Sequence, residues 1–78
     1  MITGKILDSA TILIRIGLDI KKLQREKQIS QQDLAFACNF EKSNMSRIES
    51  GGSNLTVGTL LKIATILEVK IVDLVKMD

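Results

Sequence analysis

Residues 29–51 read ISQQDLAFACNFEKSNMSRIESG, and this stretch decides how the whole chain is interpreted. Ser30 can accept a hydrogen bond from the backbone N–H of Asp33 and so begin a helix over residues 31–38. Asn39 comes next, and after Gly it is the residue that most readily adopts the left-handed conformation that ends a helix. A further helix over residues 42–50 then stops at Gly51. The stretch predicts two short helices joined by a sharp turn.

The second of these helices has an uneven composition. Only Met45 and Ile48 offer apolar side chains for a core, which is too little apolar area for the helix to exist for stability alone. Its polar side chains are those of Lys42, Ser43, Asn44, Ser46 and Arg47. Lys42 can donate to guanine, Asn44 can pair with adenine, and Arg47 can reach guanine or phosphate, while the two serines let the backbone approach the bases. The pattern therefore predicts a helix-turn-helix unit that binds double-stranded DNA.

The flanking sequence is helical as well. One apolar stripe at helical spacing predicts a helix over residues 12–27, and its members are Ile12, Ile16, Ile20 and Leu23. Thr56 can cap a fourth helix, whose stripe is Leu60, Ile63, Ala64 and Leu67, and residues 69–74 suit a short fifth one. Pro is absent and aromatic residues make up only 3%, which favours an all-α fold over a β-sandwich or barrel.

Composition excludes several classes of function. The chain has 78 residues, enough for one small domain, with one Cys and no His. A disulfide framework, a Cys/His zinc site and a His-activated nucleophile are therefore excluded, and we expect neither an enzyme nor a cofactor. The net charge is +2, and Lys and Arg outnumber Asp and Glu within residues 15–47, where a polyanion should dock. Charged residues interrupt the apolar N-terminal run, so we expect a cytoplasmic protein without a membrane segment.

Four ordered blocks carry a resemblance to a known family: residues 16–23 (IGLDIKKL), 29–35 (ISQQDLA), 45–51 (MSRIESG) and 60–69 (LLKIATILEV). With them the sequence resembles the phage repressor/Cro-like helix-turn-helix family, also called the xenobiotic-response-element family. The resemblance implies a five-helix, lambda-repressor-like DNA-binding domain over residues 16–78, commonly a homodimer on a palindromic operator. It also implies that Gln31 touches a phosphate and that Lys42, Ser43 and Arg47 face base edges. The loop Gly52-Ser53-Asn54 would offer backbone N–H groups to the second strand.

The sequence departs from the family pattern at several positions. Glu41 stands at the N-cap of helix 42–50, where the family usually has Ser or Thr. Gln24 replaces a common Arg that pairs with the acid equivalent to Glu49, so we expect a neutral amide to make this contact. Gln28 and Glu68 replace frequent helix-ending Gly residues. These changes should affect stability more than function.

Residues 1–15 have no counterpart in the family motif. We favour a helix that begins near Asp8 or Ser9, and the alternative is a strand over residues 11–14. Apolar side chains in and near this extension could form a dimer interface: Ile6, Leu13, Ile14, Leu18 and Phe36. The alternative patch is formed by Val72 and Val75.

Two functions are compatible with these features. The first is a sequence-specific transcriptional regulator, a repressor that occupies an operator as a homodimer through helix 42–50. The second is an antitoxin or protein-interaction module on the same scaffold, whose partner would be a toxin or another regulator. Cys38, with no activating base nearby in the pattern, is expected to be an inert core residue.

Overall fold

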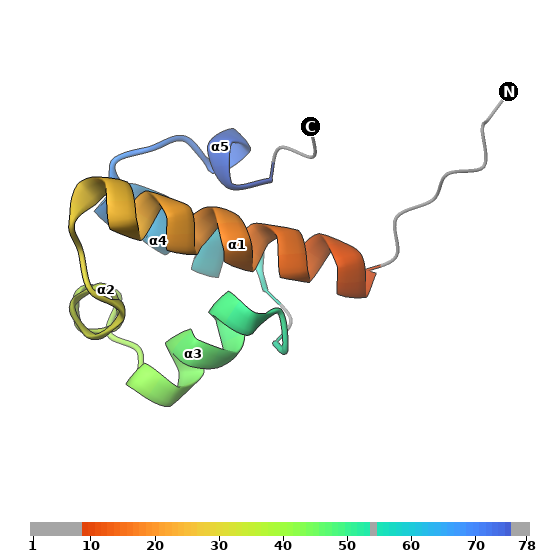
Figure 1. Ribbon diagram of the computed structural model, residues 1–78, viewed down its shortest axis with the longest axis horizontal. Helices are drawn as coiled ribbons and strands as arrows, with labels where there is room; N and C mark the ends of the chain where they lie inside the picture. The colour runs from red at the N-terminus through yellow and green to blue at the C-terminus, as the bar shows by residue number, and fades with distance from the viewer. Residues whose placement is uncertain (1–8, 54, 76–78) are drawn as a thin grey trace, which may run out of the picture.

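The computed structural model describes residues 9–53 and 55–75, and these form five α-helices. The helices are α1 (Ser9–Lys27), α2 (Gln31–Ala37), α3 (Lys42–Ser50), α4 (Val57–Leu67) and α5 (Ile71–Val75). In Figure 1, α1 crosses the middle of the molecule, with α3 below it, α5 above it and α4 behind it. No strand occurs among the described residues, so the predicted all-α class and its five helices are confirmed for this part of the chain.

The long first helix settles the conformation of part of the N-terminal extension. It begins at Ser9, which confirms the helical prediction and shows that the strand alternative over residues 11–14 is wrong. Residues 1–8, with Ile6 among them, lie outside the described part of the chain. The helical conformation includes residues 11–14 because Ile12 continues the apolar stripe of Ile16 and Ile20 in the core. A strand would break the helical spacing of this stripe.

Local side-chain caps begin two of the helices. Ser30 Oγ accepts a hydrogen bond from the backbone N–H of Asp33 at 3.0 Å, as predicted. Thr56 Oγ1 accepts one from the backbone N–H of Thr59 at 3.1 Å, which confirms the predicted start of α4. Glu41 occupies the N-cap of α3 and makes no side-chain cap bond.

Three residues other than Gly end helices in the left-handed conformation. Asn39 has φ 63°, Gln28 has φ 58° and Glu68 has φ 60°. The left-handed conformation was predicted for Asn39, and Gln28 and Glu68 stand where the family often has a helix-ending Gly. The turn at Glu68 redirects the chain, so α5 begins at Ile71, two residues later than predicted.

A single core joins all the helices. Its buried residues are Ile16, Ile20, Leu34, Ala35, Cys38, Met45, Ile48, Leu60, Ile63, Ala64, Leu67 and Leu74. Met45 and Ile48 thus bury the inner side of α3, as the sequence pattern indicated. No helix in the described part of the chain has both the length and the apolar character to cross a membrane.

Candidate nucleic-acid interface

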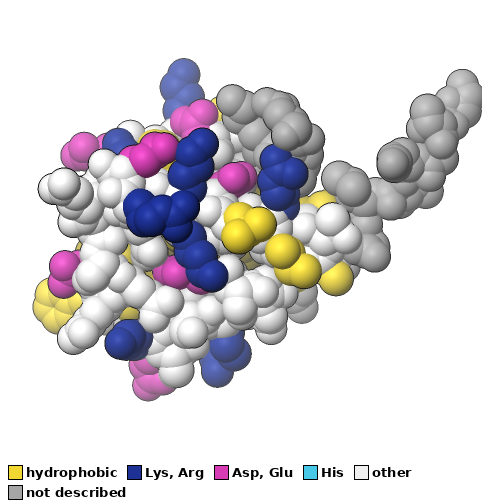
Figure 2. Space-filling model, in the orientation of Figure 1, with side chains coloured by type: hydrophobic (Ala, Val, Ile, Leu, Met, Phe, Trp, Pro, Cys, Tyr) yellow, Lys and Arg dark blue, Asp and Glu magenta, His cyan; other side chains and the backbone are white. Residues whose placement is uncertain are grey.

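The outer side of α3 is polar and open to solvent. Lys42, Ser43, Ser46 and Arg47 are exposed there, and Asn44 is half-buried. Figure 2 shows cationic side chains at the lower edge of the molecule, where α3 lies, and more of them across the front over the C-terminal half of α1. The structure therefore brings the five predicted side chains of α3 onto one short helix with a buried reverse side.

Two of these side chains contact each other. Arg47 Nη2 donates to Asn44 Oδ1 at 3.5 Å, on the exposed face of α3. Bidentate pairing with adenine would require this carbonyl oxygen of Asn44 to accept from the base. A hydrogen bond at the upper limit of length and in water is easily exchanged, so Arg47 can release Asn44 as it turns toward a base or phosphate.

The C-terminal end of α3 lies against the N-terminal half of α1. Gly51 caps α3 at φ 81°, and a Cβ built on it would stand 2.7 Å from Ile14 Cγ1. The backbone N–H of Gly52 donates to the Arg47 carbonyl at 2.9 Å. A residue with a side chain at position 51 would meet both the unfavourable φ and the neighbouring helix.

Gly17 permits a second close approach between these helices. A Cβ at this position would overlap the carbonyl oxygen of Glu49 and lie 2.7 Å from its carbonyl carbon. The backbone of α3 therefore rests directly on α1 at Gly17. The contact at Gly17 was not predicted, because a Gly inside an apolar helical pattern indicates only a cost in helix propensity.

The Glu49 carboxylate joins three helices. Glu49 is 4% exposed, and its Oε2 accepts from Gln24 Nε2 of α1 at 2.8 Å. This confirms the predicted contact between a neutral amide and Glu49. Its other oxygen, Oε1, accepts from Gln31 Nε2 of α2 at 3.1 Å, a contact that was not predicted. Among the described residues, no buried side-chain nitrogen or oxygen lacks a hydrogen-bond partner, so the polar cluster is fully satisfied.

The remaining predicted site residues are placed as follows. Gln31 is half-buried at the first position of α2, and its amide is turned to Glu49. Ser53 is half-buried in the loop between α3 and α4. Asn54 lies outside the described residues.

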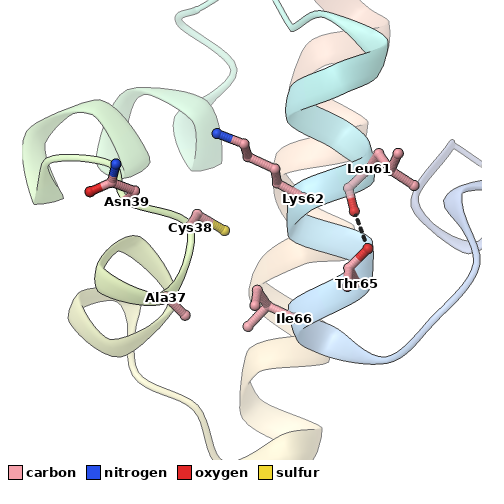
Figure 3. A pocket seen from close by; sticks show the side chains of 7 residues that line it. All are labelled: Ala37, Cys38, Asn39, Leu61, Lys62, Thr65 and Ile66. Atoms are coloured by element: carbon pink, nitrogen blue, oxygen red, sulfur yellow. Dashed lines mark hydrogen bonds between the residues drawn. The ribbon is translucent and has the colours of Figure 1, made fainter.

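A groove on another face separates the C-terminal end of α2 from α4 (Figure 3). It has a volume of about 390 Å³ and is lined by Ala37, Cys38, Asn39, Leu61, Lys62, Thr65 and Ile66. Burial raises the pKa of the Cys38 thiol above its ordinary value, and the nearby charge of Lys62 opposes the shift only in part. Cys38 is buried in the core, as predicted. Lys62 Nζ itself lies 5.5 Å from the centre of the Phe40 ring.

Comparisons with known proteins identify related sequences and folds. The family model of the Cro/C1-type HTH DNA-binding domain matches residues 19–78. An uncharacterized HTH-type transcriptional regulator of Sinorhizobium fredii, y4dJ, is 35% identical over 60 residues, which cover 77% of this chain and 78% of that protein. The family match begins inside α1, so the first half of this helix precedes it.

Solved structures show the same fold. The restriction-modification controller protein C.AhdI from Aeromonas hydrophila is 31% identical with a TM-score of 0.76, over 80% of this chain and 94% of that one. The wild-type controller protein C.Esp1396I is 36% identical with a TM-score of 0.73, over 81% of this chain and 82% of that one.

Proposed function

The chain belongs to the Cro/C1-type helix-turn-helix DNA-binding domain family of transcriptional regulators, and from this premise we propose that it is a sequence-specific repressor that binds its operator as a homodimer through α3. The observation that carries the proposal is the two-sided character of α3. Its inner side is buried and held on α1 by Gly17 and Gln24, while its outer side presents five polar side chains. A helix fixed in this way can place the same side chains at base edges each time it enters a major groove.

The side chains of this interface have different tasks. Lys42, Asn44 and Arg47 read bases or contact phosphate, and Ser43 and Ser46 keep the outer surface of α3 low. Gln31 donates to a backbone phosphate from the start of α2. The loop that contains Ser53 approaches the second strand of the DNA. We include Asn54 in this contact because it follows Ser53 in the sequence of the loop. The exposed cations Lys21, Lys22 and Arg25 add attraction for the polyanion.

Repression follows from occupancy of the operator. A copy bound at the operator would act on transcription by excluding other proteins from the DNA that it covers. Transcription in vitro from a promoter that overlaps the bound sequence should fall as the protein is added, and a rise would contradict the repressor role.

A homodimer brings a second copy of α3 to the DNA. One α3 offers few base-reading side chains, so two copies on half-sites about 10 base pairs apart are needed for the usual specific affinity. Ile14 and Leu18 are 50% and 52% exposed and lie one turn apart on α1, where Figure 2 shows hydrophobic side chains at the surface. Phe36, which is 85% exposed, belongs to α2 at the other end of α1 and does not continue this patch. We therefore assign the interface to the stripe of Ile14 and Leu18.

Sedimentation tests the interface with two matched variants. Leu18→Asp should yield a monomer at micromolar concentration, because a charge would be buried in the apolar contact. Val72→Asp alters a residue of α5 that is 54% exposed and should remain dimeric. The opposite result would move the interface to α5.

Selection from random duplex DNA, followed by binding isotherms, tests the proposed function itself. On the selected site, Lys42→Ala and Arg47→Ala should each cost about 1–3 kcal/mol. Lys70→Ala removes an exposed cation between α4 and α5, on the side of the molecule away from α3, and should leave the affinity unchanged. If no duplex is selected, or if both α3 variants bind as tightly as the wild type with unchanged circular dichroism, the proposal is wrong.

A further inference from the structure

The side-chain amide of Gln31 donates one hydrogen bond within the protein and has a further N–H group for a second acceptor. Its Nε2 carries two hydrogens, and one of them is donated to Glu49 Oε1 at 3.1 Å. The two hydrogens of an amide nitrogen point in different directions, so a second acceptor can be bound at the same time. Gln31 is only half-buried, and it lies at the first position of α2, on the helix that leads into the turn before α3.

An ionised carboxylate only accepts hydrogen bonds, and this determines which way the amide faces. If the Gln31 amide turned over, its Oε1 would face Glu49 Oε1, and two acceptors would repel each other. Glu49 itself cannot turn away, because Gln24 Nε2 holds its other oxygen at 2.8 Å and the residue is buried. Glu49 therefore selects the orientation of Gln31 in which Nε2 is the inward atom.

We propose that Glu49 is a positioning residue for DNA binding, which holds the Gln31 amide so that its second Nε2 hydrogen is donated to a phosphate of the DNA backbone. The inference rests on the proposed function, since the phosphate belongs to a bound duplex. Phosphate oxygens also only accept, so an amide presenting its oxygen at this place would weaken binding. Glu49 stands on α3, so the same residue that seats the base-reading helix on α1 also sets the contact of α2 with the backbone.

A double-mutant cycle on the full chain tests this coupling. Gln31→Ala should weaken binding to the selected duplex by about tenfold, the effect of one hydrogen bond to a charged acceptor. Glu49→Gln keeps the shape of the side chain but replaces one acceptor with a donor, and it should weaken binding by a similar factor. In the double variant the loss should be no greater than in Gln31→Ala alone, because Glu49 acts through Gln31.

Two features of the loss of DNA affinity distinguish the positioning of Gln31 by Glu49 from a general disturbance of α3. Gln31 is neutral, so its removal should lower the affinity for specific and random duplexes by the same factor and leave the salt slope unchanged. A displaced α3 would instead lose specificity. A matched control accompanies the cycle. Gln32→Ala changes the exposed neighbouring amide and should not alter affinity.

A measurement on the wild-type protein tests the inference even if the Glu49→Gln variant does not fold. In the nuclear magnetic resonance spectrum, the two Nε2 protons of Gln31 should be well separated, and the second should shift downfield and exchange more slowly when the duplex is added. If the affinity losses of Gln31→Ala and Glu49→Gln multiply in the double variant, or if the duplex leaves the second proton unmoved, the inference is wrong. A wild-type protein that binds no duplex at all would overturn the proposed function and this inference together.

Discussion

Gly17→Ala is the sharpest test of how α3 is held, because it adds one methyl group where two backbones meet. The new Cβ would overlap the Glu49 carbonyl oxygen and lie 2.7 Å from the Glu49 carbonyl carbon and 3.0 Å from the Ile48 carbonyl oxygen. Ordinary van der Waals contact begins at 3.4 Å, so the Glu49 carbonyl carbon alone must move away by about 0.7 Å and the overlapping carbonyl oxygen by more. All three atoms belong to the backbone of α3, which cannot rotate away as the end of a side chain could.

The magnitude follows from two opposed effects. Overpacking of this kind costs about 3 kcal/mol at its upper end, and replacing a mid-helix Gly with Ala returns about 1 kcal/mol. The net loss is about 2 kcal/mol, which for a domain of this size lowers the melting temperature by about 8–16 °C. The displaced α3 should also lose more affinity for the selected duplex than for random DNA, since base contacts depend on its position.

Gly58→Ala is the matched control in α4. A Cβ there would lie 3.7 Å from Thr56 Oγ1, an ordinary contact, and the residue is exposed. This variant should gain about 0.5 kcal/mol and raise the melting temperature by about 2–4 °C, with unchanged DNA binding. Thermal denaturation followed by circular dichroism measures both. A Gly17→Ala protein that melts at or above the wild-type temperature would refute the direct backbone contact.

Two further predictions concern the left-handed helix ends and the buried thiol. Glu68→Gly should raise the free energy of unfolding by about 0.5 kcal/mol, because relief of the strain at φ 60° outweighs the entropy that Gly adds to the unfolded chain; a loss in urea titrations would contradict it. Cys38 should react with a thiol reagent far more slowly in the native protein than in denaturant, since burial raises its pKa. Because the folded pKa is the higher one, this contribution to stability is present below pH 9.0 and is lost as the pH rises through the folded value, so native stability that rises above pH 9.0 would contradict the shift.

The helix ends could be predicted from sequence because each depends on residues a few positions apart. Ser30 and Asp33 form their cap within one turn of chain, and Asn39 ends α2 through its own backbone preference. The polar side of α3 was equally accessible, since helical period alone separates Met45 and Ile48 from the residues that face outward. The family resemblance added the position of Gln24 opposite Glu49.

The contacts that hold α3 in place could be predicted only in part. Gln31 and Glu49 stand 18 residues apart, and Gln24 and Glu49 stand 25 apart, so no local pattern links them. Gly17 supports a backbone of another helix, which a sequence period cannot show. Leu18 and Phe36 were both candidates for one apolar dimer interface. The structure places them on separate surfaces, because the chain reverses between them.

The replacement of an Arg by Gln24 has a consequence for a protein whose partner is a polyanion. The carboxylate of Glu49 is buried and receives two neutral amide donors, so added salt screens this contact little. The cations that would meet DNA, Lys42 and Arg47, are exposed and are fully subject to screening. Raising the ionic strength should therefore weaken DNA binding while the contact between α3 and α1 stays intact. Affinity measured across a salt series then reports phosphate contacts at the interface, undisturbed by loss of the structure that positions it.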